Sequence, residues 1–142
     1  GRTVHSLAKL LALFNVRLIY VSPPALNMPD ELVAALTERG VRQDRHTDLK
    51  DVLPETDVLY VTRIQKERFT DADEYERLKD VYSITPQVLH SAKPDMTLMH
   101  PLPRVGEISM EVDSDPRAAY FRQMEYGLFV RMALLALVLG KA

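Results

Sequence analysis

"RLIYVSPPALNMPDELVAALTERGVRQDR", residues 17–45, places two strand-like runs on either side of one helical segment. The run at 17–21 is short, apolar and β-rich, which is typical of a strand buried on both faces of a sheet. Pro29 suits the first position of a helix and Gly40 suits its end, so a helix is predicted between them. Residues 41–45 are a weaker strand candidate. Strand, helix and strand in this order predict a right-handed βαβ unit with parallel strands.

Three further helices are predicted from their end signals. Residues 1–14 are amphipathic, Thr85 and Pro86 give a helix start, and Pro116 precedes a long helix predicted over 117–139. No strand precedes the first of these helices, although a βαβ series requires one. We therefore expect the sequence to have been cut from a longer chain at that point.

The remaining strand candidates are short β-rich runs at 57–62, 96–99 and, more weakly, 81–84. Helices that alternate with such runs predict an α/β fold. The expected architecture is a mostly parallel open sheet of about four to five strands flanked by helices, with a long C-terminal helix. The 142 residues fit one domain of ordinary size.

Composition excludes several classes of function. The net charge of −2 gives no basic field for nucleic acid and no polybasic patch for a membrane, and no apolar run approaches the ~20 residues that span a bilayer. The absence of cysteine suits a reducing compartment, so we expect a cytoplasmic protein without nucleic-acid or membrane partners. No nucleotide-binding motif and no histidine pair with metal-ligand spacing is present, so no cofactor and no metal are expected.

Ligands of open α/β sheets bind beyond the carboxyl ends of the strands, where helix N-termini also point. Residues that this rule selects are Arg2, His5, Ser22, Pro23, Pro24, Thr62, Arg63, Gln65 and 100–104. Arginines on this rim predict an anion site, because the guanidinium fork suits a carboxylate or a phosphate. No nucleophile–base arrangement is visible, so the residues favour anion binding over covalent catalysis.

The stretch "MHPLPR", residues 99–104, has two prolines separated by one leucine. Each proline fixes its own φ and pushes the preceding residue towards extended geometry. Two such constraints in three residues predict a backbone whose carbonyls point in set directions.

Four stretches carry a family resemblance: "GRTVHSL" (1–7), "DVLYVTRIQKERF" (57–69), "MHPLPRVGEI" (99–108) and "VDSDPRAAYFRQ" (112–123). Together they resemble aspartate transcarbamoylase, the carbamoyltransferase of pyrimidine synthesis, and look most like the multifunctional pyrimidine-synthesis polypeptides of animals and fungi. The resemblance covers essentially the whole chain. It implies a homotrimeric enzyme that transfers the carbamoyl group of carbamoyl phosphate to L-aspartate, giving N-carbamoyl-L-aspartate and phosphate.

By this resemblance, residues 1–142 are the aspartate-binding domain, the second half of a two-domain enzyme. The carbamoyl-phosphate motifs S-T-R-T and H-P-x-Q are absent, so the carbamoyl-phosphate domain is expected as a partner and the isolated chain is expected to be inactive. The charged segment 66–80 matches the family's mobile loop.

The resemblance also implies roles for single residues. Arg2, Arg63 and Gln65 would bind aspartate, and the backbone of Leu102 and Pro103 would face the carbamoyl group and the attacking amine. No catalytic side chain is assigned. The supporting residues would be His5, His100, Pro101 and Arg104.

Two alternatives stay open. One is ornithine transcarbamoylase, whose relatives carry cysteine in "HCLP" where this chain has Pro101, a difference that favours a dicarboxylate acceptor. The other is a non-catalytic amino-acid-binding or scaffold module.

Overall fold

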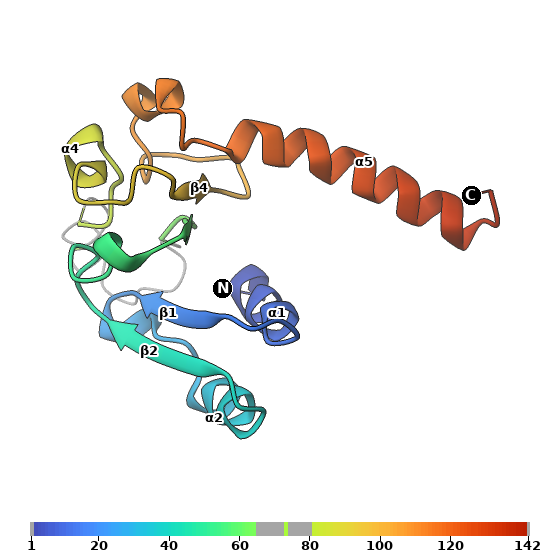
Figure 1. The fold of residues 1–142 in the computed structure, drawn as a ribbon, viewed down its shortest axis with the longest axis horizontal. Coiled ribbons are helices and arrows are strands. Elements are labelled where there is room, and N and C mark those ends of the chain that lie inside the picture. The colour runs from blue at the N-terminus through green and yellow to red at the C-terminus, as the bar shows by residue number, and fades with distance from the viewer. Residues whose placement is uncertain (1, 65–72, 74–80, 142) are drawn as a thin grey trace. The chain divides into compact units, whose positions relative to one another are not determined.

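The structure is a computed structural model that describes residues 2–64, 73 and 81–141. It divides into two compact units, Gly1–Val52 and Leu53–Ala142. Each unit contains one pair of parallel strands with helices beside it (Figure 1). The units are described separately below.

The first unit is the βαβ segment predicted from residues 17–45, preceded by a helix. Its elements are α1 (Arg2–Leu11), β1 (Arg17–Val21), the 3-10 turn η1 (Pro24–Leu26), α2 (Asp30–Glu38) and β2 (Arg42–His46). β1 and β2 pair in parallel over five residues, with Leu18 opposite Gln43. Gly40 follows α2 with φ of 81°, a left-handed conformation that glycine adopts at little cost, so it ends the helix as predicted.

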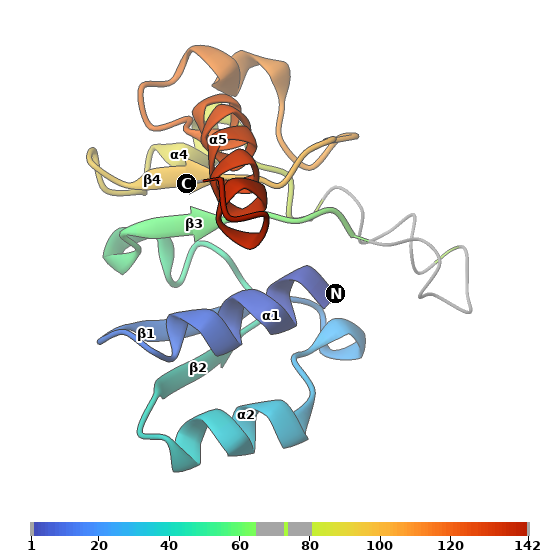
Figure 2. The ribbon, with the colours of Figure 1, turned by 90° about the vertical axis from the view of Figure 1, so that its right-hand side faces the viewer.

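Both helices of the first unit pack on this strand pair (Figure 2). The core is formed by Ala8 of α1, Leu18 of β1, Leu36 of α2 and Met28 of the connection. The sequence prediction that β1 is buried on both faces is wrong for this chain, because Leu18 is its only buried residue. The polar strand β2 has no buried residue.

The second unit contains β3 (Val58–Tyr60) and β4 (Thr97–Met99), which pair in parallel with Leu59 opposite Leu98. Leu98 is fully buried, and its backbone bonds on the other side to Arg117 and Ala119. The remaining elements are the 3-10 turns η2 (Leu53–Glu55) and η4 (Met110–Ser114) and the helices α4 (Pro86–Leu89) and α5 (Tyr120–Val138). The segment 81–84 forms no strand, because only Ile84 makes a bridge, to Ile108.

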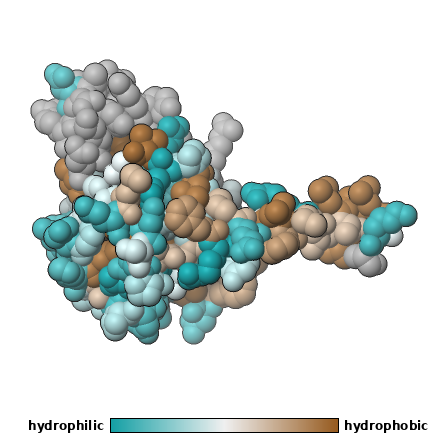
Figure 3. All heavy atoms as spheres, turned by 90° about the horizontal axis from the view of Figure 1, so that it is seen from above, coloured by the Kyte–Doolittle hydropathy of each residue, from teal (hydrophilic) through white to brown (hydrophobic). Residues whose placement is uncertain are grey.

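Helix α5 starts in the core and continues with its apolar side chains exposed. Tyr120 is fully buried, whereas apolar residues along the second half of the helix are more than half exposed. Figure 3 shows apolar side chains gathered along this end. The exposed apolar residues here are Leu128, Phe129, Val130, Met132, Leu134, Leu135, Leu137, Val138 and Leu139. Among the described residues, no helix has the length and apolar character needed to cross a membrane.

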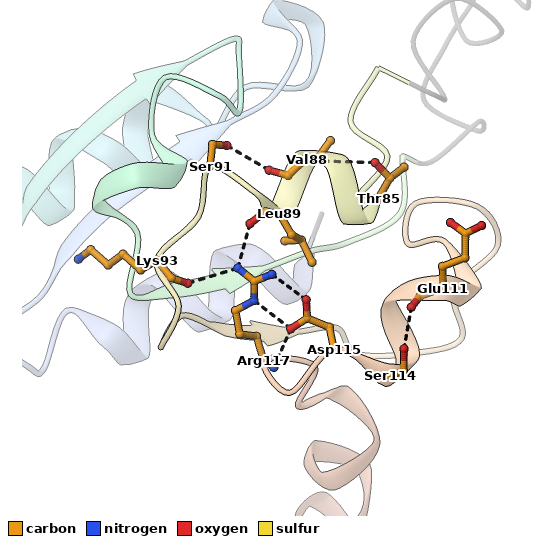
Figure 4. A network of polar contacts seen from close by, with 9 residues as sticks. All are labelled: Thr85, Val88, Leu89, Ser91, Lys93, Glu111, Ser114, Asp115 and Arg117. Carbon is orange, nitrogen blue, oxygen red and sulfur yellow. Dashed lines mark hydrogen bonds and ion pairs between the residues drawn. The ribbon is translucent and has the colours of Figure 1, made fainter.

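The α/β class, the parallel strands and the long C-terminal helix are therefore confirmed. Four strands are present in the described part of the chain, and they form two parallel pairs. The predicted helix start at Thr85 is also confirmed, since its hydroxyl accepts the Val88 N–H at 3.4 Å (Figure 4).

Candidate functional site

The backbone turns sharply directly after β4, at the stretch with two prolines. Leu102 has φ of 47°, and the peptide bond between Leu102 and Pro103 is cis. A leucine in the left-handed region costs on the order of 1–3 kcal/mol, and such residues cluster at functional sites. The turn therefore needs neighbours that hold it, and the structure contains them.

A buried histidine–glutamate contact lies under this turn. His100 is 1% exposed and Glu107 is 7% exposed, and His100 Nε2 lies 2.8 Å from Glu107 Oε1. The other ring nitrogen, Nδ1, accepts the Leu102 N–H at 2.8 Å. Both nitrogens of His100 are thus engaged inside the protein, so the ring is not available as a general base.

Glu107 is held as a carboxylate by the loop that contains it. Its Oε2 accepts the N–H groups of Val105 and Gly106, both at 3.0 Å. Burial alone would raise the pKa of Glu107, but the hydrogen bonds from Gly106, Val105 and His100 outweigh burial and lower it. The 100–107 loop, defined as residues 100 to 107, is therefore closed by a carboxylate that carries its charge at neutral pH.

Gln123 of α5 connects this loop to the end of β3. Its Oε1 accepts the His100 backbone N–H at 3.0 Å. Gln123 also hydrogen bonds to the hydroxyl of Tyr60, and this contact partly offsets the burial that raises the pKa of Tyr60. One side chain thus joins the last residue of β3 to the residue that follows β4.

Arg104 fixes the loop from the other side. Its Nη2 donates to Asp113 Oδ2 at 2.7 Å, and Nη1 donates to Asp113 Oδ1 and to the Tyr120 hydroxyl, the latter at 3.3 Å. Tyr120 donates its own hydroxyl proton to Asp113 Oδ1. The guanidinium carbon lies 5.6 Å from the centre of the Tyr120 ring.

These contacts shift the pKa values of the three groups. Hydrogen bonds from Arg104 and Tyr120 lower the pKa of Asp113 to about 2, and the bond to Asp113 raises that of Arg104. Burial, together with the bond to Asp113, raises the pKa of Tyr120 to about 12. Arg104 was expected on the arginine rim of an anion site and, by the resemblance, as a supporting residue; in the structure the anion in its guanidinium fork is the protein's own Asp113.

A second arginine pair anchors the start of α5 to the α4 region (Figure 4). Arg117 donates Nε and Nη2 to Asp115 at 2.9 and 2.7 Å, and Nη1 to the backbone oxygen of Leu89 at 2.9 Å. These contacts are internal to the unit, so the role of Arg117 is to hold α5 in place.

The predicted site residues fall into separate parts of the structure. The loop brings together His100, Pro101, Leu102, Pro103 and Arg104. Arg63 lies three residues beyond the end of β3 and is exposed. Gln65 and the charged segment 66–80, apart from Asp73, lie outside the described residues.

Arg2 and His5 lie in the other unit. Arg2 is the first residue of α1, as predicted, and its side chain lies outside the described part. His5 is half-buried one turn later on the same helix.

Sequence reasoning missed four residues that build the site: Glu107, Asp113, Tyr120 and Gln123. All four lie inside the quoted stretches at 99–108 and 112–123, whose polar residues could have been assigned as partners for His100 and Arg104. Within the described part of the chain, no group of three or more metal-ligating side chains is placed to hold a metal ion.

The second unit is thus an α/β structure that presents a braced loop at the carboxyl end of a parallel strand, the usual ligand position of this fold class. The family described as "Aspartate/ornithine carbamoyltransferase, Asp/Orn binding domain" matches residues 1–138. The chain belongs to this family.

Several relatives match almost the whole chain. It is 60% identical to "Multifunctional protein pyr1-3" of Dictyostelium discoideum and 57% identical to "Multifunctional protein CAD" of Squalus acanthias, over 99% of this chain and 6% of each relative. It is 54% identical to "Aspartate carbamoyltransferase catalytic subunit" of Thermococcus onnurineus, over 99% of this chain and 45% of that protein. The predicted resemblance to the multifunctional pyrimidine proteins is confirmed.

Solved structures of aspartate transcarbamoylases are also similar to this chain. The catalytic subunit of M. jannaschii aspartate transcarbamoylase is 44% identical with a TM-score of 0.91, over 100% of this chain and 47% of that chain. The Trypanosoma cruzi aspartate transcarbamoylase in complex with carbamoyl phosphate is 47% identical with a TM-score of 0.86, over 95% and 45%. The chain therefore spans less than half the length of these enzymes.

Proposed function

We propose that this chain is the aspartate-binding half of an aspartate transcarbamoylase. The whole enzyme would transfer the carbamoyl group of carbamoyl phosphate to L-aspartate in de novo pyrimidine synthesis. The observation that carries this proposal is the 100–107 loop, in which Leu102 has φ of 47° and is braced by His100. Support comes from T. cruzi aspartate transcarbamoylase, which has been solved with carbamoyl phosphate and aspartate.

The loop would act by positioning. The carbonyls of Leu102 and Pro103 would face the carbamoyl group and the aspartate amine, while Arg2, Arg63 and Gln65 would hold the aspartate carboxylates. Fixed dipoles at the transferring group lower the barrier without reorganisation, and no covalent intermediate is needed. The loop's polar side chains bond within the protein, His100 to Glu107 and Arg104 to Asp113 and Tyr120, which leaves the backbone as the part that meets the substrate.

The remainder of the enzyme would supply what residues 1–142 lack. A carbamoyl-phosphate domain would provide donors for the phosphate, and the enzyme would be a cytoplasmic homotrimer without nucleic-acid or membrane partners. The exposed apolar side chains of α5 are consistent with a helix that other parts of the enzyme cover.

Aspartate is favoured over ornithine as the acceptor. The description of the family names both aspartate and ornithine, so membership of the family does not decide between these two acceptors. Pro101 occupies the position where ornithine enzymes carry cysteine, and Arg63 supplies a positive charge that suits a dicarboxylate.

The direct test is Arg63→Ala in the full-length protein, with Arg122→Ala, an exposed arginine of α5, as the matched control. Loss of a charge-assisted contact of about 1.5–3 kcal/mol raises the KM for aspartate roughly 10- to 150-fold. The KM for carbamoyl phosphate stays nearly constant, and the control behaves as wild type. Equal weakening of both substrates would contradict the proposed role of Arg63.

A further inference from the structure

His100 is fixed in one chemical form by its two partners. A backbone N–H can only donate, so Nδ1, which lies 2.8 Å from the Leu102 nitrogen, has to be the acceptor. The proton of the neutral ring is then on Nε2, which points at Glu107 Oε1. The geometry of the two contacts thus determines the tautomer.

Glu107 is suited to select this form. A carboxylate only accepts hydrogen bonds, and Oε2 is already occupied by the N–H groups of Val105 and Gly106. Oε1 is left to accept the proton on His100 Nε2. The other tautomer would place a bare ring nitrogen against a carboxylate and a ring N–H against the Leu102 N–H, so both contacts would become repulsive.

The hydrogen bonds of His100 hold the Leu102 N–H in place. Leu102 carries the only positive φ of a residue other than glycine in the described part of the chain. The ring of His100 is held in place by the contact of Nε2 with Glu107 Oε1, and its backbone N–H is bonded to Gln123 Oε1. Three contacts, to Glu107, Gln123 and Leu102, therefore hold one residue at the base of the turn.

We infer that His100 is a positioning residue whose Nδ1 holds the Leu102 N–H, with Glu107 selecting the tautomer, and that this contact sets the direction of the carbonyls at 102 and 103. This inference rests on the proposed function only for the role of those carbonyls in binding substrate. His100 is buried and fully hydrogen bonded, so it acts through the backbone and does not touch substrate.

Two substitutions separate the two nitrogens of the ring. Asparagine places Oδ1 near the position of Nδ1 and accepts the N–H two residues on, as in an Asx-turn, but it does not reach Glu107. Glutamine places its amide near the position of Nε2 and reaches Glu107, but offers no acceptor to Leu102. His100→Asn therefore retains the inferred contact, and His100→Gln removes it.

In the full-length enzyme, His100→Asn is expected to keep kcat within about threefold of wild type. His100→Gln is expected to lose on the order of 100-fold in kcat, because a misplacement of about 1 Å is sufficient for such a loss. His90→Asn and His90→Gln, at an exposed histidine, are the matched controls and change nothing. If His100 served only to satisfy buried Glu107, the glutamine variant would be the more active one, and that ranking would overturn the inference.

A crystal structure of each variant gives a readout that does not depend on activity. Leu102 keeps its left-handed φ in the asparagine variant and leaves that region in the glutamine variant. A retained φ in His100→Gln overturns the inference, as does a folded His100→Asn variant with little activity. A wild-type enzyme that carbamoylates neither aspartate nor ornithine would refute the proposed function instead, and the φ of Leu102 would still decide the positioning role.

Discussion

Replacing Arg104 by lysine tests whether the guanidinium fork braces the 100–107 loop. Lysine keeps the charge but offers one ammonium group in place of a planar fork. The substitution therefore removes one of the two bonds to Asp113, the 3.3 Å bond to the Tyr120 hydroxyl, and the contact with the Tyr120 ring.

The magnitude follows from burial. A charge-assisted hydrogen bond contributes about 1.5–3 kcal/mol in favourable cases. Because the Arg104 and Asp113 side chains are 17% and 31% exposed, solvent weakens the pair. We therefore expect Arg104→Lys to lower the free energy of unfolding by about 1–2 kcal/mol.

Urea unfolding of the chain at low protein concentration measures this difference, as a shift in midpoint at constant slope. Arg122→Lys is the matched control, because Arg122 is exposed and makes one 3.4 Å bond to the Ala118 oxygen. Its effect should stay within about 0.5 kcal/mol. Equal midpoints for Arg104→Lys and Arg122→Lys would refute the bracing role of the fork.

Three other predictions concern the same loop and helix. Asp113→Asn should be less stable than wild type at neutral pH. The lowered pKa of Asp113 stabilises the fold above the unfolded value of 3.8, and this contribution is lost as the pH falls through about 2. The difference seen by circular dichroism should therefore vanish near pH 2, and a constant difference would contradict the shift. Pro101→Cys in the full-length enzyme should loosen the turn and lower kcat for aspartate without creating ornithine activity; efficient carbamoylation of ornithine would refute the acceptor assignment. The isolated 142-residue chain should show no turnover and should self-associate through the exposed end of α5, whereas ordinary enzymatic rates or a strict monomer in analytical ultracentrifugation would contradict the half-enzyme proposal.

Local signals predicted the elements well. The bounds of β1, the end of α2 near Gly40 and the cap at Thr85 depend on residues close to one another in the chain. The burial of a strand depends on elements that are distant in the sequence and cover its faces. The apolar composition of β1 therefore led to an overestimate of its burial. The segment 81–84 has strand-like composition but meets a partner only at Ile84, which composition cannot reveal.

Only part of the site was predicted, because its other contacts join residues that are distant in the sequence. The two prolines indicated a shaped turn, and the structure has one at Leu102. The partners that brace it come from residues 7 to 23 positions further on, and their pairing depends on how the loop folds back. Arg104 shows the limit of reasoning from residue type, since a rim arginine suits an anion equally well whether the anion is a ligand or the protein's own Asp113.

The central claim is tested most directly by the acceptor that the full-length protein uses. The protein is supplied with carbamoyl phosphate and either L-aspartate or L-ornithine, and the products are identified by mass spectrometry. We predict N-carbamoyl-L-aspartate and phosphate in equal amounts with aspartate, and no product with ornithine. Carbamoylation of ornithine, or of neither amino acid, would contradict the assignment of this domain to aspartate transcarbamoylase.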